Sequence, residues 1–419
     1  MERQTFKFTN LDQKIDLSNF HKLTSRMNSQ TMSVVESADV RLYESFDQMN
    51  LPDELLRGIY SYGFEKPSLI QQKGIVPIKE GRDLIAQAQS GTGKTGTFSI
   101  GAICRIDPSL KKPQVLVLVP TRELAQQIEN VASSLGQHFP ITTYAATGGT
   151  PLNVDLRAME KGVQFVVGTP GRIYDLIHRG ALQRQNIRVL AMDEADQMLE
   201  DRFREQVMCI LEKGFPKDTQ VALFSATMPT EVLEFAEKLL NNPVRILVPP
   251  EEVTLEGIKQ YYIQLEREEW KYEVLCDLYQ QLNINQAMIY CNKRQRAEWL
   301  AEKMGQQGFP LSYIHGEMDV EERRRRMKDF RTGNIRVLIS TDLLARGIDV
   351  QQVSLVINYE LPMQRENYVH RIGRSGRFGR KGVAINLLTK DEMTVMKEIE
   401  SHYVTHVEAL PEDLAAITL

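Results

Sequence analysis

The sequence SGTGKT, from Ser90 to Thr95, follows a strand-like run from Asp83 to Ala88 and leads into a helix-like stretch that starts at Gly96. A glycine-rich turn between a strand and a helix is a phosphate cradle, because its backbone N–H groups point inward and the helix N-terminus adds positive potential. In this pattern Lys94 reaches the β- and γ-phosphates and the Thr95 hydroxyl can bind Mg²⁺. We therefore expect a phosphate loop built from Ser90, Gly91, Thr92, Gly93, Lys94 and Thr95.

A second signal is an acidic cluster about a hundred residues further on. The apolar run from Val189 to Met192 leads directly into Asp193-Glu194-Ala195-Asp196. A strand that delivers adjacent carboxylates to its end is typical of the place where a phosphate-loop ATPase binds Mg²⁺ and orients its attacking water. A solvated acidic loop is the alternative, but the strand directs these carboxylates at the predicted phosphate site. The two signals together predict a nucleotide hydrolase that uses ATP and Mg²⁺, with Lys94 neutralising phosphate oxygens, Thr95 and Asp193 holding the metal, and Glu194 polarising the water.

Composition narrows the class of protein. A chain of 419 residues predicts two or three domains, each large enough for its own core. A net charge of −4 excludes a chain that is basic throughout, so any binding of nucleic acid requires a local positive surface. The four cysteines lack metal-ligand spacing, which favours reduced thiols in an intracellular compartment. With no apolar run of membrane length and no apolar signal core at the N-terminus, we expect a cytoplasmic protein without a membrane partner.

The chain alternates short apolar runs with longer amphipathic stretches such as Arg122 to Leu135. Near-continuous apolar strands that alternate with helices indicate a parallel sheet covered on both faces. The predicted strands of the first series are Asp83–Gln89, Gln114–Val119, Thr142–Ala146, Phe165–Val167, Val189–Met192 and Val221–Phe224. Those of the second series are Gln260–Gln264, Gln286–Tyr290, Leu311–Ile314, Ile335–Ser340, Leu355–Tyr359 and Val383–Leu388.

These series predict two α/β domains on a short linker. We expect a flexible extension at 1–40, a first domain at 41–243, a linker at 244–254 marked by proline and acidic residues, and a second domain at 255–419. The second series has no phosphate loop of its own. The second domain is therefore expected to close on a nucleotide that the first domain holds.

Further motifs follow in an order that resembles the DEAD-box family of ATP-dependent RNA helicases, from about Phe46 to the C-terminus. They include a segment from Gly63 to Gln71 with the isolated aromatic Phe46 upstream. The others are Pro120-Thr121-Arg122-Glu123-Leu124-Ala125, Gly148-Gly149, Thr169-Pro170-Gly171-Arg172, Ser225-Ala226-Thr227, Ser340-Thr341-Asp342, Ala345-Arg346-Gly347-Ile348-Asp349, and the run from His370 to Arg377. Departures from the family pattern occur at Lys293, Val320 and Ser375.

The resemblance implies two tandem RecA-like domains and assigns residues to roles. The amide of Gln71 suits adenine, because it offers a donor beside an acceptor, and Phe64 provides a stacking surface. Asp349 is implied at the ribose, and Arg374 and Arg377 at the γ-phosphate as arginine fingers. Lys66 and Phe378 complete the nucleotide set. Backbone contacts to RNA are implied for Thr121, Arg122, Gly148, Gly149, Thr169, Arg172, Arg323 and Thr341, and coupling of hydrolysis to domain geometry for Asp196, Ser225 and Thr227.

The resemblance also implies an activity. We expect an RNA-dependent ATPase that closes on ATP and single-stranded RNA together, with little sequence preference, and unwinds short duplexes locally. The stretch from Leu343 to Gln352 resembles the branch of the family that acts in translation initiation. A monomer that meets a scaffold protein bridging both domains is implied. The alternative is an ATP-gated RNA clamp in nuclear mRNA processing, whereas a DNA helicase is disfavoured by the motif set.

Overall fold

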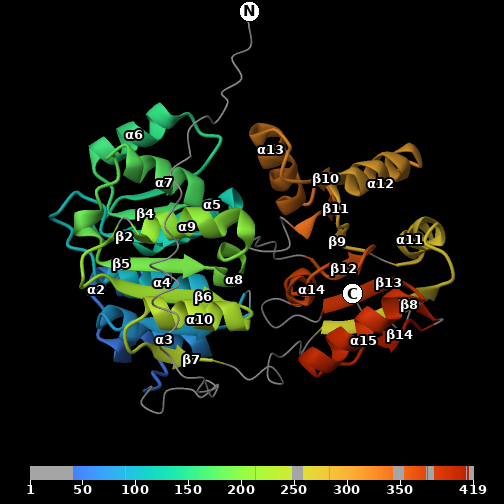
Figure 1. The fold of residues 1–419 in the computed structure, drawn as a ribbon, viewed down its shortest axis with the longest axis horizontal. Coiled ribbons are helices and arrows are strands. Elements are labelled where there is room, and N and C mark those ends of the chain that lie inside the picture. Colours follow the sequence, from blue (N-terminus) through green and yellow to red (C-terminus); the bar gives the residue numbers. More distant parts are fainter. Residues whose placement is uncertain are drawn as a thin grey trace, which may run out of the picture. The chain divides into compact units, whose positions relative to one another are not determined.

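The computed structural model describes residues 41–89, 91–212, 214–247, 258–282, 284–342, 353–373, 375, 382–411 and 413–414, except for the side chains of residues 201 and 202. Within these residues the chain forms two seven-stranded sheets in which every paired strand runs parallel to its neighbour. Figure 1 shows helices packed on both faces of each sheet. This arrangement confirms the predicted α/β fold with two parallel sheets. The predicted extension at 1–40 lies outside the described residues.

The first sheet has the strand order β3-β4-β2-β5-β6-β1-β7. Its strands are short and buried because apolar side chains point to both faces, as a sheet covered on both sides requires. The bounds are β1 Leu84–Gln87, β2 Val115–Leu118, β3 Thr143–Ala146, β4 Phe165–Gly168, β5 Val189–Asp193, β6 Gln220–Ser225 and β7 Val244–Ile246.

Two apolar layers cover this sheet, and alternate residues of one strand enter different layers. Val115 and Val117 of β2 pack in one core, and Leu116 and Leu118 pack in the other. This alternation is the two-residue period of a strand. The first core includes α2 Asp53–Ser61, α3 Leu69–Lys79, α4 Lys94–Ile103 and α5 Arg122–Leu135; the second includes α6 Leu152–Lys161, α7 Pro170–His178, α8 Ala195–Met198, α9 Asp201–Glu212 and α10 Thr230–Leu239.

The second sheet repeats the plan, with the order β10-β11-β9-β12-β13-β8-β14. Numbered within its own series, this order is the same as that of the first sheet. The strands are β8 Ile258–Leu265, β9 Ala287–Tyr290, β10 Leu311–Ile314, β11 Val337–Ser340, β12 Leu355–Asn358, β13 Gly382–Thr389 and β14 Glu408–Ala409. The helices are α11 Trp270–Gln281, α12 Arg294–Gln306, α13 Val320–Arg331, α14 Arg365–Ile372 and α15 Glu392–Tyr403.

Two edge strands lie outside the predicted runs. β7 falls at the start of the predicted linker, yet its three residues pair with β1 and form the edge of the first sheet. Residues 244–246 therefore belong to the first sheet. β14 has two exposed residues that pair with Tyr261 and Tyr262 of β8. Two short 3₁₀ helices, η1 Phe46–Met49 and η2 Arg184–Asn186, complete the described elements.

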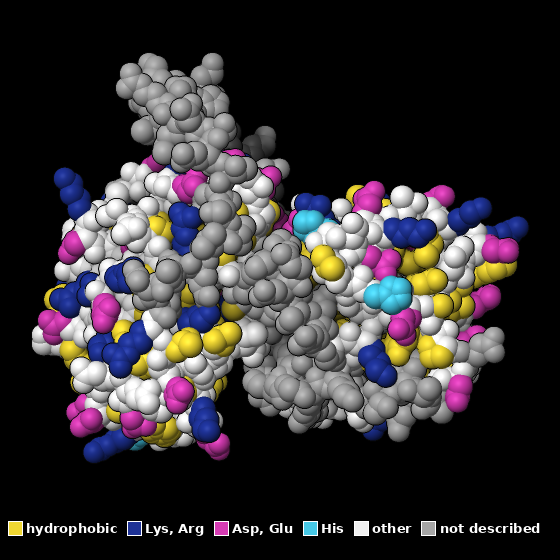
Figure 2. All heavy atoms as spheres, turned by 90° about the horizontal axis from the view of Figure 1, so that it is seen from below, with side chains coloured by type: hydrophobic (Ala, Val, Ile, Leu, Met, Phe, Trp, Pro, Cys, Tyr) yellow, Lys and Arg dark blue, Asp and Glu magenta, His cyan; other side chains and the backbone are white. Residues whose placement is uncertain are grey.

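The surface matches the mixed composition. On the face drawn in Figure 2, basic and acidic side chains are interspersed, as a net charge of −4 on a chain with 51 basic and 55 acidic residues leads one to expect. None of the four cysteines, all of which the structure describes, forms a disulfide. Among the described residues, none of the helices combines the length and apolarity that crossing a membrane requires.

Candidate ATPase and RNA-binding site

The predicted phosphate loop joins the end of β1 to the start of α4. Gly93 is the N-cap of α4 with a φ of 106°, in the left-handed region that favours glycine. A Cβ at this position would lie 2.7 Å from Oγ of Ser68 and 2.9 Å from Nε2 of Gln71. Both backbone conformation and space therefore require glycine here. Ser90 lies outside the described residues.

Lys94 is the first residue of α4 and points at the acidic cluster. Its Nζ lies 3.8 Å from Oδ1 of Asp193 and 3.7 Å from Oε1 of Glu194. The side chain is 5% exposed, and Nζ has no hydrogen-bond partner among the residues that the structure describes. A buried ammonium without a hydrogen bond is costly, so this geometry fits an anionic group that supplies the missing acceptor.

The carboxylates sit where β5 ends. Glu194 has a φ of 54°, a left-handed conformation that is uncommon for a residue with a side chain and is often found at functional sites. The backbone N–H of Glu194 donates to Oδ1 of Asp193 at 2.9 Å. Burial raises the pKa of Asp193 to about 6, although the nearby Lys94 acts in the opposite direction. Burial disfavours the ionised form of Asp193, and a cation bound beside the carboxylate would stabilise that form. Carboxylate oxygens are ligands that Mg²⁺ prefers, so the donor set fits Mg²⁺.

Asp196 takes part in a buried network that crosses to β6. Its Oδ1 accepts a hydrogen bond from Ser225 Oγ at 2.7 Å, and its Oδ2 accepts one from Thr227 Oγ1 at 2.7 Å. The contact expected between these side chains is present, and their role in coupling stays a prediction. Nε2 of His370, from α14, lies 3.0 Å from Asp196 Oδ2. His370 is the first residue of the motif that runs to Arg377, but the sequence predicts no role for it.

The predicted adenine residues lie against the phosphate loop. Oε1 of Gln71 accepts from the backbone N–H of Ser68 at 2.9 Å, and its Nε2 lies 3.4 Å from the carbonyl oxygen of Gly93. Gln71 is thus the third residue of α3, and its side chain reaches back to the N-cap Ser68 in a capping box. Phe64 stacks on the buried Phe46 with ring centroids 6.3 Å apart. Lys66, also predicted here, is exposed.

The predicted RNA residues of the first domain gather around Arg122. A Cβ added to Gly148 or Gly149 would lie 3.3 Å or 2.8 Å from the Arg122 guanidinium, so both glycines allow the arginine to approach the backbone. Burial lowers the pKa of Arg122, and the charges of Arg323 and Arg172 lower it further. Three like charges near one another favour a bound anion.

Other predicted RNA residues already have partners within the protein. The hydroxyl of Thr121 caps α5 by accepting from the N–H of Leu124 at 3.2 Å. Arg323 is 6% exposed, and its Nε and Nη2 donate to the two carboxylate oxygens of Glu123 at 2.7 and 3.0 Å. Thr169 and Thr341 are partly exposed at the carboxyl ends of β4 and β11.

Arg172, near the start of α7, is likewise paired. Its Nη1 donates to Oδ2 of the fully buried Asp155, and its Nη2 donates to the carbonyl oxygen of Thr150 at 2.8 Å. Oδ1 of Asp155 accepts from the Tyr144 hydroxyl at 2.6 Å. Neither Asp155 nor Tyr144 was singled out from the sequence, because no motif contains them.

Comparison with known proteins identifies the family. The family model described as DEAD/DEAH box helicase matches residues 68–235, and the helicase conserved C-terminal domain matches 270–379. The chain is 55% identical to the ATP-dependent RNA helicase eIF4A of Neurospora crassa, over 91% of this chain and 96% of that protein. It is 53% identical to eukaryotic initiation factor 4A of Caenorhabditis elegans, over 91% and 95%. The chain belongs to the DEAD-box family of ATP-dependent RNA helicases.

Solved structures agree with this assignment. Dbp5 of Saccharomyces cerevisiae bound to RNA and ADP BeF3 has a TM-score of 0.84 and 37% identity, over 89% of this chain and 97% of that chain. Mss116p bound to ssRNA and AMP-PNP has a TM-score of 0.80 and 25% identity, over 93% and 85%. The protein is therefore an ATP-hydrolysing enzyme that binds RNA, with the tandem RecA-like fold expected of a DEAD-box helicase.

The arginine-rich motif of this DEAD-box helicase divides into two parts. Arg371 is fully buried and donates to Asp342, to Asn292 Oδ1 at 2.7 Å and to the carbonyl oxygen of Glu360 at 2.6 Å. These bonds assign Arg371 to the packing of the second sheet. Predicted contacts of four other nucleotide residues lie outside the described residues: Asp349, Arg374, Arg377 and Phe378.

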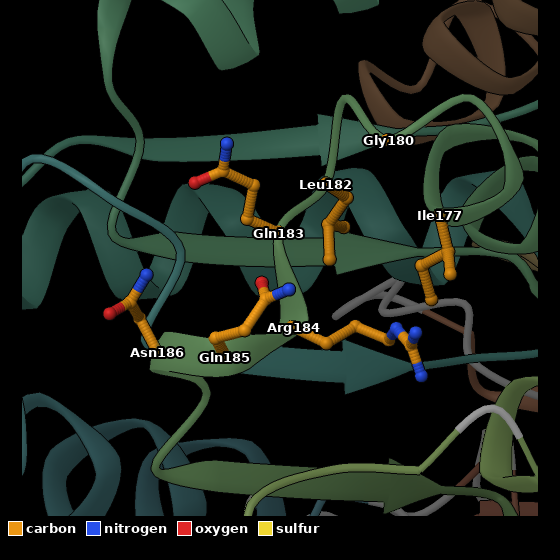
Figure 3. A pocket seen from close by; sticks show the side chains of 7 residues that line it. All are labelled: Ile177, Gly180, Leu182, Gln183, Arg184, Gln185 and Asn186. Atoms are coloured by element: carbon orange, nitrogen blue, oxygen red, sulfur yellow. The ribbon is translucent and has the colours of Figure 1, made fainter.

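A separate hollow of about 490 Å³ lies away from this site on the first sheet. Figure 3 shows the side chains that line it, from the end of α7 through η2. Since η2 precedes β5, the hollow lies at the end of this strand opposite to Asp193 and Glu194. Its lining residues are Ile177, Gly180, Leu182, Gln183, Arg184, Gln185 and Asn186.

Proposed function

We propose that this DEAD-box helicase acts in translation initiation in the cytoplasm, where it uses ATP to remove local structure from RNA. The proposal is supported by the relatives at 53–55% identity that carry initiation-factor names and match over nearly their full length. The nuclear-clamp alternative has no comparable support among them. We retain the predicted division into two domains and infer that the protein acts as a monomer with a scaffold protein that bridges them.

The observation that carries the ATPase site is the buried Lys94 Nζ, which faces two carboxylates yet makes no hydrogen bond within the described part of the chain. We infer that it binds the β- and γ-phosphates, together with the loop N–H groups of residues 90–93. Thr95 and Asp193 hold Mg²⁺. When bound, this ion neutralises phosphate charge.

Hydrolysis then depends on positioning. Glu194 accepts a hydrogen bond from the attacking water and orients the water oxygen toward the γ-phosphorus. Arg374 and Arg377 neutralise charge that develops on the phosphoryl oxygens, which makes turnover depend on domain closure. Asp349 binds the ribose, and adenine is held by Phe64, Gln71, Lys66 and Phe378. For Gln71 this requires its amide to exchange one of its two present bonds for the base.

RNA binding follows the backbone. Arg122 and the N–H groups of Gly148 and Gly149 form an accessible part of the track, because among the described residues Arg122 has no carboxylate partner as tight as that of Arg323 or Arg172. Thr121, Thr169 and Thr341 add hydroxyl donors. Arg323 reaches phosphate by exchanging Glu123 for RNA. Contacts of this kind read backbone shape, so little sequence preference results.

A matched pair of variants tests the whole proposal. Glu194→Gln keeps size and hydrogen bonding but removes the charge that polarises water, whereas Glu231→Gln removes a charge from the exposed first turn of α10. Added in excess to a cell-free translation extract, Glu194→Gln should block translation of an mRNA with a structured leader and spare one with an unstructured leader. Glu231→Gln should block neither. RNA-stimulated ATP hydrolysis at the wild-type rate by Glu194→Gln would remove its assigned role, and equal effects on both mRNAs would argue against the initiation function.

A further inference from the structure

One buried carboxylate lies beside the RNA track and has no role so far. Asp155, in the first turn of α6, has no exposed surface. Carboxylates are rarely buried in full unless they are paired. Here both oxygens are used, one by the Tyr144 hydroxyl and the other by the Arg172 guanidinium. The buried carboxylate of Asp155 is therefore stabilised by both partners. Loss of either one would leave an oxygen of this buried charge without its hydrogen bond.

The network surrounds a single loop. Tyr144 lies on β3, before the loop at 147–151, and Asp155 lies just after it on α6 (Figure 1 shows α6 beside α7). Arg172 comes from α7 and bonds the loop itself, through the carbonyl oxygen of Thr150. Three separate elements thus connect the two sides of this five-residue loop, and one of them also bonds its fourth residue, Thr150.

This loop carries Gly148 and Gly149. Gly149 has a φ of 89°, and a Cβ there would meet both Arg122 and Val320. Its N–H direction therefore depends on a backbone conformation that few residues adopt, and that conformation must be held from outside. Burial and the Asp155 hydrogen bond both raise the pKa of Tyr144, so its hydroxyl stays a donor throughout the physiological range.

We propose that Asp155 is a positioning residue for RNA binding: through Arg172 and Tyr144 it holds the loop at 147–151 so that the Gly148 and Gly149 amides face the RNA backbone beside Arg122. The inference rests on the proposed RNA track. It also assigns a different role to Arg172, which was predicted to contact RNA directly. In the proposal, Arg172 promotes RNA binding chiefly by linking the carbonyl oxygen of Thr150 to Asp155. Its planar, forked guanidinium makes both bonds from two different nitrogens in a fixed geometry, which the single ammonium nitrogen of a lysine does not reproduce.

The test measures affinity for a labelled oligouridine in the presence of Mg²⁺ and a non-hydrolysed ATP analogue, across a range of salt concentrations. Asp155→Asn keeps the shape and removes the charge, and Tyr144→Phe removes only one donor. Asp175→Asn is the control, because Asp175 forms a solvent-exposed pair with Arg179 on the same helix as Arg172. Affinity of each variant for the ATP analogue is measured in parallel.

We expect Asp155→Asn and Arg172→Lys to weaken RNA binding by about tenfold and Tyr144→Phe by about threefold, as the loss of bonds to a buried charge implies. Asp175→Asn should match the wild type, and affinity for the nucleotide analogue should be unchanged in all four. The salt dependence separates positioning from direct contact. Its slope should stay constant in Asp155→Asn, but fall by about 0.7 in Arg122→Ala, which loses one phosphate contact.

Two results would overturn the proposal. One is a folded Asp155→Asn protein with wild-type RNA affinity, which would leave Asp155 with a role in stability alone. The other is tighter RNA binding with a steeper salt slope, which would mean that Asp155 competes with RNA for Arg172. Should Asp155→Asn fail to fold, Tyr144→Phe decides, and wild-type affinity there contradicts the proposal. A wild-type protein that did not bind oligouridine would instead contradict the proposed RNA track.

Discussion

Nζ of Lys94 lies 3.7 Å from Oε1 of Glu194, beyond hydrogen-bonding distance, although both side chains are almost completely buried. At this distance the two charges attract each other without a hydrogen bond between them, so Lys94 gains little to offset its loss of hydration. A ligand that accepts a hydrogen bond from Lys94 would supply the missing interaction. Nucleotide binding should therefore contribute measurably to the stability of the first domain.

The first prediction concerns that contribution. A magnesium complex of a non-hydrolysed ATP analogue should raise the thermal midpoint, because at a hundred times its Kd a ligand adds about 2.7 kcal/mol to the free energy of unfolding. Lys94→Ala should remove most of the rise. Differential scanning calorimetry with and without nucleotide provides the measurement. A variant that still shows the full rise would show that phosphate does not depend on Lys94.

The second prediction separates two roles of Gln71. Loss of the capping box in Gln71→Ala should lower the free energy of unfolding by about 1 kcal/mol. The same change should weaken ATP binding, since adenine loses a donor and an acceptor. Serine at position 68 offers a control, because Ser68→Ala disturbs the same cap without touching the base. If Ser68→Ala weakens ATP binding as much as Gln71→Ala, the cap alone accounts for the effect. GTP and ATP supporting equal turnover in the wild type would likewise remove the adenine-reading role.

The third prediction tests closure. Arg374→Ala or Arg377→Ala should reduce RNA-stimulated hydrolysis by roughly 10³–10⁵, the usual effect of removing an arginine finger. ATP binding by the first domain should persist, because Lys94 is unaffected. Fluorescence energy transfer between labels on the two domains should report compaction only when the ATP analogue and RNA are both present. Compaction with RNA alone, or full RNA-stimulated activity from residues 1–247, would contradict the two-domain mechanism.

The fourth prediction follows from a thiol. Burial raises the pKa of Cys104 to about 12, so at pH 8 this cysteine is almost entirely protonated in the folded protein. Because the thiolate is the reactive form, alkylation of Cys104 should be slow at pH 8 and accelerate as the pH rises. Unfolding in guanidinium should restore the ordinary rate. Peptide mass spectrometry after timed exposure to iodoacetamide measures the difference, and equal rates in folded and unfolded protein would contradict the burial.

Much of the fold could be predicted because the apolar residues that mark strands and helices in the sequence are also the residues that are buried in the structure. The helix at Arg122–Leu135 has the predicted bounds, and every predicted strand overlaps an observed one. β14 is different: its two residues are exposed, so no apolar pattern marks them, and only pairing with β8 makes them a strand. The short run that forms β7 falls in the predicted linker because prolines flank it on both sides, and only its pairing with β1 places it in the first sheet.

The candidate site likewise contains residues that a local sequence pattern marks and residues whose role depends on distant elements. Residues that act through backbone geometry, such as Gly93 and Lys94, occupy short segments whose spacing carries the signal. Asp155 could not be found in this way, because a single acidic residue on an amphipathic helix has the pattern of a solvated one. His370 and Arg371 are adjacent in sequence, and only the structure separates them: one contacts Asp196, and the other is bonded within the second sheet. Sequence spacing shows which residues are close along the chain, whereas their partners depend on distant elements.

The repeated strand order has a consequence for stoichiometry. Each position at the carboxyl edge of the first sheet has a counterpart in the second, and the counterpart of the phosphate loop is the turn after β8, which contains the exposed Glu266, Glu268 and Glu269. The turn also contains Arg267, and Glu268 pairs with Arg296, so it carries a small excess of negative charge, whereas the phosphate loop carries Lys94. The two sheets share one strand order but differ in charge at these equivalent turns, so we expect one chain to bind one nucleotide, at the first sheet.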